Sequence, residues 1–189
     1  MIHNIVKDIL RLYEIKSFVE TGTFEGDTLV IIESWLSDLP HLKDIYGIDL
    51  WDKAIEITSK RVKKTQLFQN NSVDWLKENI DKMVYPAFFY LDAHNFGRLP
   101  AEQQQISNTF TIDKLLFIQE LEVLLKSSHQ FIVCIDDWNA EFNFKQTCHL
   151  LPYVWVTNSP NKDGRFSAYF VKNLDETLLT TNLPVYREE

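Results

Sequence analysis

The sequence has 189 residues, enough for one domain with a substantial hydrophobic core. Its formal net charge of −8 argues against binding nucleic acid through many phosphate contacts, and no apolar run approaches the ~20 residues that span a membrane. The 2 cysteines cannot build a disulfide framework, and the amphipathic N-terminus lacks a signal-peptide pattern. We therefore expect a cytoplasmic globular protein that binds neither nucleic acid nor membranes.

Helical and strand patterns alternate from the start of the chain. Apolar residues at helical spacing predict a helix over 4–15, and a short apolar run that ends at Glu20 predicts the first strand. Further helices are predicted at 27–38, 52–62, 72–83 and 113–127, and further strands at 44–50, 65–70, 86–94 and 129–138. Strands that are apolar on both sides and separated by helices indicate a parallel sheet covered on both faces.

The end of the chain departs from this alternation. Strand patterns at 153–157 and 165–173 flank the turn-forming sequence NSPNKDG, which predicts an antiparallel hairpin. The predicted fold class is α/β: a single doubly wound, Rossmann-like sheet of about seven strands, mostly parallel, with an antiparallel C-terminal hairpin. We expect one domain over 1–189, with its core at about 16–172.

A glycine-containing loop, ETGTFEG, runs from Glu20 to Gly26 between the first strand and the next helix. Such a loop is typical of a nucleotide-type site, where small residues let a ligand approach the backbone, although a packing turn is the alternative. It lacks the lysine of a P-loop and the third glycine of the dinucleotide motif. Its acidic side chains, Glu20, Glu25 and Asp27, would repel a pyrophosphate and suit a cationic nucleoside such as S-adenosylmethionine.

Polar residues also follow the second and third strands. Asp49 ends the second strand, where a carboxylate can accept hydrogen bonds from both ribose hydroxyls or cap a helix. Asn71 and Ser72 follow the third strand, where they could meet an adenine or cap the next helix. All of these residues are predicted to lie at the carboxyl edge of the sheet, where open α/β sheets bind ligands.

Three aspartates end two apolar strands at the same predicted edge. Asp92 follows the fourth strand, and Asp136 and Asp137 end the fifth. Converging carboxylates are costly without a cation, and their oxygens suit Mg²⁺ or Ca²⁺, which could lower the pKa of a substrate hydroxyl. Loop caps or ion pairs are the alternative.

His94 is the candidate general base, because an imidazole titrates near neutral pH, although a structural histidine is the alternative. The polar segment 95–112 is long for a loop inside a compact domain. It is either a lid that contacts a hydroxylated substrate or a disordered surface segment.

Five short segments carry a family resemblance when they are taken in order: ETGTFEG, IDL, NNS, FYLDAH and IDDW. Together they resemble class I S-adenosylmethionine-dependent methyltransferases over about 16–172. The glycine loop is similar to that of small O-methyltransferases of the catechol and macrocin types, and to that of bacterial methyltransferase-like proteins. The predicted hairpin matches the antiparallel seventh strand of that family.

The resemblance implies a role for each matching residue. It places Glu20, Gly22 and Gly26 at the methionine end of the cofactor, Asp49 and Leu50 at the ribose and adenine, and Asn71 and Ser72 at the adenine edge. The predicted cofactor site is completed by Thr21, Thr23 and Asp92. The positions of Asp92, Asp136 and Asp137 imply a magnesium site.

One position departs from the catechol-type pattern. Those enzymes carry a lysine as base shortly after the position of Asp92, whereas this chain has Ala93, His94 and Asn95. We therefore predict His94, with Asp92, as the catalytic residues of an S-adenosylmethionine-dependent enzyme that methylates a hydroxyl of a small molecule or sugar. The alternatives are a non-catalytic interaction module with the same fold and a nucleotide-binding oxidoreductase. The oligomeric state is left open, with a homo-oligomer as one option.

Overall fold

The computed structural model describes residues 4–93, 116–138, 150–151, 153–157, 166–182 and 185–187. Within these ranges the strands form one eight-stranded sheet in the order β3-β2-β1-β4-β5-β7-β6-β8. Its parallel strands are β1 (Ser17–Thr21), β2 (Asp44–Asp49), β3 (Gln66–Gln69), β4 (Ala87–Leu91) and β5 (Phe131–Trp138). The α/β fold class and the mostly parallel sheet are confirmed.

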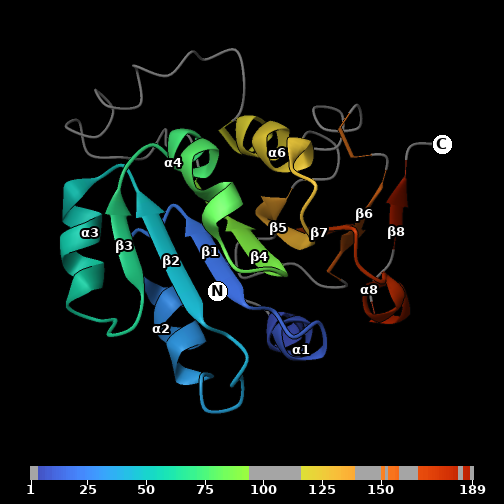
Figure 1. Cartoon of the computed structure of the whole chain (residues 1–189), viewed down its shortest axis with the longest axis horizontal. Helices are drawn as coiled ribbons and strands as arrows, with labels where there is room; N and C mark the ends of the chain where they lie inside the picture. The colour runs from blue at the N-terminus through green and yellow to red at the C-terminus, as the bar shows by residue number, and fades with distance from the viewer. Residues whose placement is uncertain are drawn as a thin grey trace.

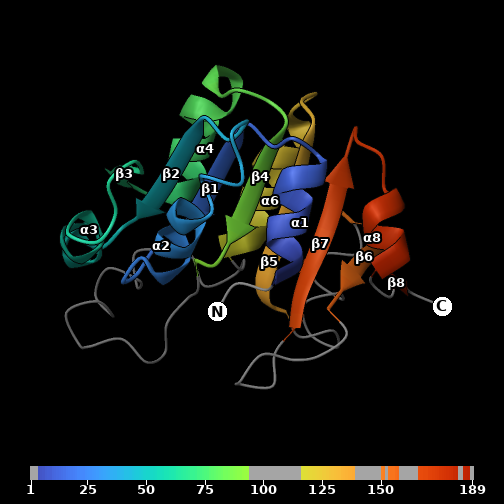
Figure 2. The ribbon, with the colours of Figure 1, turned by 90° about the horizontal axis from the view of Figure 1, so that it is seen from below.

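Helices cover both faces of this sheet (Figures 1 and 2). α1 (Asn4–Leu12) and α2 (Asp27–Ser34) pack on one face, against a core that includes Phe18, Phe88 and Ile132. α4 (Ser72–Asn79) and α6 (Leu116–Lys126) pack on the other, against Val19, Phe89 and Val133. Successive residues of a strand point to opposite faces, so each central strand contributes to both cores. α3 (Asp52–Ser59) lies beside β2 and β3.

β1 lies between β2 and β4, and the chain builds the sheet outwards from it in both directions. The register pairs Thr21 with Ile48 on one side and with Leu91 on the other, so the carboxyl ends of the three strands lie level. In open α/β sheets this change of direction opens the crevice in which ligands bind.

The C-terminal strands reverse direction. β7 (Phe166–Lys172) lies between β5 and β6 (Tyr153–Val156) and is antiparallel to both, which confirms the predicted hairpin. α8 (Thr177–Asn182) and the edge strand β8 (Val185–Arg187), which pairs with β6, were not predicted. The NSPNKDG turn and the segment 95–112 lie outside the described residues.

α1 ends at Leu12, three residues before the predicted end. The N–H of Glu14 bonds to the carbonyl of Arg11, and the N–H of Ile15 bonds to the carbonyl of Leu10. Glu14 has a φ of 47°, and this left-handed residue with its two hydrogen bonds is a Schellman termination. Among the described helices, none combines the length and apolarity that crossing a membrane requires.

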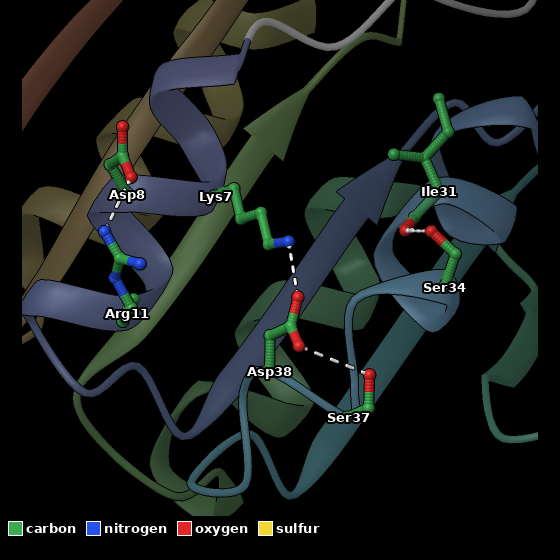
Figure 3. Close-up of polar contacts among 7 residues, drawn as sticks. All are labelled: Lys7, Asp8, Arg11, Ile31, Ser34, Ser37 and Asp38. Atoms are coloured by element: carbon green, nitrogen blue, oxygen red, sulfur yellow. Dashed lines mark hydrogen bonds and ion pairs between the residues drawn. The ribbon is translucent and has the colours of Figure 1, made fainter.

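A surface contact joins α1 to the segment that follows α2 (Figure 3). Lys7 Nζ lies 2.6 Å from Asp38 Oδ2 and 5.8 Å from the centre of the Trp35 ring. The Lys7 and Asp38 side chains are 34% and 57% exposed, so solvent weakens the ion pair. Buried α1 side chains such as Val6 and Ile9 therefore stabilise the packing of this helix more than Lys7 does.

Glu33, near the end of α2, joins this helix to the loop between α3 and β3. Its carboxylate accepts the backbone N–H groups of Lys63, Lys64 and Thr65 and the Thr65 hydroxyl, at 2.7–3.0 Å. Partial burial raises the pKa of Glu33, but these hydrogen bonds outweigh it, so that the pKa is lowered.

We expect Glu33→Gln to lower the free energy of unfolding by about 1–2 kcal/mol at neutral pH, because several N–H groups lose a charged acceptor. Since the folded-state pKa of Glu33 is below the unfolded value, its contribution is present at neutral pH and disappears as the pH falls through the lowered pKa. Urea denaturation at neutral and acidic pH measures the effect. Glu56→Gln, at an exposed pair with Lys60, is the matched control and should change little. Equal stability of parent and Glu33→Gln at neutral pH would contradict this role.

Candidate cofactor site

The loop from β1 to α2 has a left-handed backbone at three positions. Gly22, Phe24 and Gly26 have φ values of 78°, 45° and 76°. The Gly22 N–H bonds to the carbonyl of Ile48 at 2.8 Å, and the Gly26 N–H closes a turn on Thr23 at 2.7 Å. Gly26 then caps the N-terminus of α2. The predicted order of strand, glycine loop and helix is therefore present.

Close packing explains why two of these positions need glycine. A Cβ on Gly22 would lie 2.7 Å from the carbonyl oxygen of Asp92 and from Cα of Ala93. A Cβ on Gly26 would lie 2.6 Å from a methyl carbon of Thr58 in α3. The missing side chains thus let β4 and α3 approach the loop. The expected approach of a ligand to the loop backbone stays a prediction.

Glu20 is the most buried acid of the predicted cofactor site. It is the penultimate residue of β1, with 2% of its surface exposed, and its side chain hydrogen-bonds to Thr28. Burial raises the pKa of Glu20 well above its ordinary value, and the nearby carboxylates of Asp92, Asp49 and Asp136 raise it further. A cation beside Glu20 would relieve this cost.

Several buried polar atoms at the same edge of the sheet have no hydrogen-bond partner in the part of the chain that the structure describes. They are Glu20 Oε2, Thr21 Oγ1, Thr23 Oγ1 and Ser72 Oγ. Native proteins satisfy most buried polar atoms, so a polar ligand at this edge could supply partners that the described residues lack. All four residues belong to the predicted cofactor site, and the buried carboxylate of Glu20 is the part of it that suits a cationic ligand.

The other two acids of the loop do not add to this negative site. Glu25 and Asp27 are both exposed, and Asp27 Oδ1 lies 2.6 Å from Arg61 Nη2. Arg61 also donates a hydrogen bond to the carbonyl of Glu25. Of the three acids in and beside the loop, only Glu20 is therefore left, together with Asp49 of β2, to attract a cation.

Asp49 holds the glycine loop against the turn that follows β2. Its Oδ2 accepts the N–H of Phe24 at 2.9 Å, and its Oδ1 accepts the N–H of Trp51 at 2.8 Å. Burial raises the pKa of Asp49, and these hydrogen bonds oppose the shift. Each oxygen keeps a second lone pair, so the carboxylate can still accept ribose hydroxyls. Leu50, next to it, is half-buried.

Asn71 and Ser72, the two residues predicted at the adenine edge, differ in their hydrogen bonding. Asn71 caps α4, because its side chain accepts the N–H groups of Val73 at 2.9 Å and Asp74 at 3.2 Å. The capping alternative is therefore present at Asn71. Ser72 begins the helix, and its buried hydroxyl is one of the orphaned groups. Contact of either residue with adenine stays a prediction.

The described residues do not support the magnesium site that the sequence predicted. Asp136 is 7% exposed, and its two oxygens accept the hydroxyls of Tyr90 at 2.6 Å and Ser167 at 2.7 Å. Within the described ranges, no three His, Cys, Asp or Glu side chains are grouped to hold a metal ion. His94 and the side chain of Asp137 lie outside the described residues. Asp92 is half-buried just after β4, and its N–H bonds to the carbonyl of Thr21.

The sequence did not predict the cluster of Tyr90, Asp136 and Ser167. These residues come from β4, β5 and β7, so the cluster joins the parallel part of the sheet to its antiparallel part. Tyr90 and Ser167 stand in apolar strand patterns, and only the register of β7 brings Ser167 to Asp136. The alternation of β5 was the available signal, because it turns Asp136 to the same face as Cys134.

Solved structures with a similar fold are methyltransferases. The O-methyltransferase from Bacillus cereus, in complex with S-adenosylhomocysteine (SAH), superposes with a TM-score of 0.58 at 13% identity, over 89% of this chain and 79% of that one. The O-methyltransferase TomG from Streptomyces achromogenes, in complex with S-adenosylmethionine, gives 0.57 at 13% identity, over 89% and 78%. The chain has the methyltransferase fold.

The methyltransferase fold leaves the acceptor open. A putative rRNA-methylase from Clostridium thermocellum also matches, with a TM-score of 0.50 at 15% identity, over 92% of this chain and 100% of that one. No protein-family model matches the sequence, and no curated protein matches it significantly. At these identities the solved structures establish the fold, whose members are adapted to different substrates.

We expect Tyr90→Phe to lower the free energy of unfolding by about 1–3 kcal/mol, because a buried oxygen of Asp136 loses its donor. A metal site would not respond in this way, because its carboxylates would be satisfied by the cation. Tyr46→Phe, at a half-buried tyrosine of β2, is the matched control. Chemical denaturation of the three proteins measures the difference.

The same account predicts that millimolar Mg²⁺ and EDTA give identical thermal melting curves for the parent protein. A bound ion would stabilise the fold by about 2.7 kcal/mol at a hundredfold excess over Kd. Stabilisation by Mg²⁺ that disappears in Asp136→Asn would show that Asp136 is a metal ligand after all.

Proposed function

We propose that the protein is an S-adenosylmethionine-dependent methyltransferase that methylates a hydroxyl group of a small molecule or sugar. The observation that carries this proposal is the buried carboxylate of Glu20, near the end of β1 in a methyltransferase fold, with one oxygen that has no partner among the described residues. Burial raises the pKa of Glu20, and the carboxylates of Asp92, Asp49 and Asp136 raise it further. Such a site favours a ligand with positive charge and no phosphate.

Each described residue has a defined task in this proposal. Glu20 faces the cationic methionine end, with Thr21 and Thr23 offering their unpartnered hydroxyls. Asp49 accepts the ribose hydroxyls on the lone pairs that Phe24 and Trp51 leave free. When bound, S-adenosylmethionine supplies a methyl group that an acceptor oxygen can take by in-line displacement.

The acceptor hydroxyl must lose its proton as the new bond forms. Asp92 lies at the carboxyl end of β4, two residues before His94, which we propose as the general base. The proposal includes no divalent cation: Asp136 has hydroxyl partners in Tyr90 and Ser167, and no group of side chains that could hold a metal ion occurs among the described residues. A cytoplasmic location and the absence of a nucleic-acid partner stay predictions, and the choice between a monomer and a homo-oligomer is open.

Isothermal titration calorimetry of the parent protein tests the proposal. We expect S-adenosylmethionine and SAH to bind. NAD should give no binding heat, because its pyrophosphate would lie beside the carboxylates of Glu20 and Asp49. Binding of NAD alone would favour the oxidoreductase alternative. Binding of none of the three would favour an interaction module that has the fold without the cofactor.

We further expect the affinity for S-adenosylmethionine to rise with pH through the raised pKa of Glu20, because the ionised carboxylate holds a cation better than the neutral acid does. Binding should release a proton, which calorimetry in two buffers of different ionisation enthalpy detects. Glu20→Gln should bind more weakly and release no proton from this group. If the parent protein releases no proton, or if Glu20→Gln binds with the parental affinity, Glu20 does not contact the cofactor.

A further inference from the structure

The solvent exposure of the Phe24 side chain and the conformation of its backbone are both unfavourable for folding. Its side chain lies in the glycine loop and is 52% exposed. Its φ of 45° falls in the left-handed region, which is strained for any residue with a Cβ. Among the described residues, the other non-glycine positions with positive φ are Glu14 and Asn173, both polar. An exposed phenyl ring on a strained backbone is therefore a candidate for function.

The backbone of Phe24 is held from two sides. Its N–H donates to Asp49 Oδ2 at 2.9 Å, and its carbonyl accepts the Thr58 hydroxyl at 3.1 Å. Asp49 of β2 and Thr58 of α3 thus hold the peptide groups on both sides of Phe24. The surrounding structure therefore imposes the left-handed conformation and sets the position from which the ring projects.

Among the described residues, the aromatic neighbour of the Phe24 ring is Trp51. The two rings stack with their centroids 6.3 Å apart and their planes at 22°. The N–H of Trp51 donates to the other oxygen of Asp49 at 2.8 Å. One carboxylate thus positions both members of the aromatic pair, Phe24 and Trp51, and it is the carboxylate that accepts the ribose in the proposed function.

We propose that the aromatic pair Phe24 and Trp51 contacts the nucleoside of the bound cofactor beside Asp49. This inference rests on the proposed function and adds a surface to the cofactor site. Aromatic faces stack favourably on the planar base or pack against the ribose. They also exclude water from the hydrogen bonds of Asp49, which strengthens those bonds. The ligand that fits has an apolar planar group and a vicinal diol close together.

Phe24→Asn separates binding from folding, because asparagine tolerates the left-handed conformation but has no ring. We expect its affinity for SAH to fall about tenfold, with a melting temperature equal to or above that of the parent. Phe24→Tyr keeps the ring and should bind as the parent does. Glu14→Asn, at a left-handed position at the end of α1, is the matched control and should leave affinity unchanged.

If Phe24→Asn binds SAH with the parental affinity, the inference is overturned. It is also overturned if Phe24→Tyr loses as much affinity for SAH as Phe24→Asn does. A parent that binds neither S-adenosylmethionine nor SAH overturns the proposed function as well. A parent that binds SAH with the same affinity as Phe24→Asn overturns the aromatic contact alone.

Tryptophan fluorescence gives a second readout. The chain has 5 tryptophans, and we expect SAH to change the emission of the parent protein, with the change reduced in Trp51→Phe. Equal changes in the two proteins would place Trp51 away from the ligand and overturn its part in the contact.

Discussion

The buried carboxylate of Glu20 is the constraint on which the candidate site depends. β1 lies between two parallel strands, so an acid at its end is enclosed by backbone on both sides. Burial raises the pKa of Glu20 well above its ordinary value, and the carboxylates of Asp92, Asp49 and Asp136 raise it further. The raised pKa favours the neutral form of Glu20, and a cationic ligand beside it would favour the ionised form. The burial that the sheet topology imposes on Glu20 thus underlies our proposal of a cationic ligand.

Neighbouring carboxylates differ in function because their partners differ. Asp136 is closed by the hydroxyls of Tyr90 and Ser167 and joins three strands. Asp49 is bound by two backbone N–H groups and organises the loop and the aromatic pair. Glu20 alone of these three keeps an orphaned oxygen in the described structure. The unpartnered oxygen distinguishes Glu20 from Asp49 and Asp136, although all three acids lie near strand ends.

The sequence predicted the order of strands and helices because the period of the apolar residues reports secondary structure locally. It missed β8, since an edge strand of three residues carries too short a pattern. It also placed Asp136 at the correct edge but could not foresee its pairing with Ser167, which depends on the register of β7. In the same way, the ion pair of Asp27 with Arg61 joins residues far apart in the chain. The described site therefore differs from the predicted one where side chains far apart in the sequence pair with each other.

The most direct test of the central claim is an NMR titration of the Glu20 side-chain carboxyl carbon, assigned by comparison with Glu20→Gln. The account predicts a pKa well above the ordinary value of a glutamate in the free protein. It predicts that saturation with S-adenosylmethionine lowers this pKa, because the ligand cation stabilises the ionised carboxylate. An ordinary pKa in the free protein, or the same raised pKa with and without the ligand, would contradict the claim that Glu20 selects a cationic cofactor.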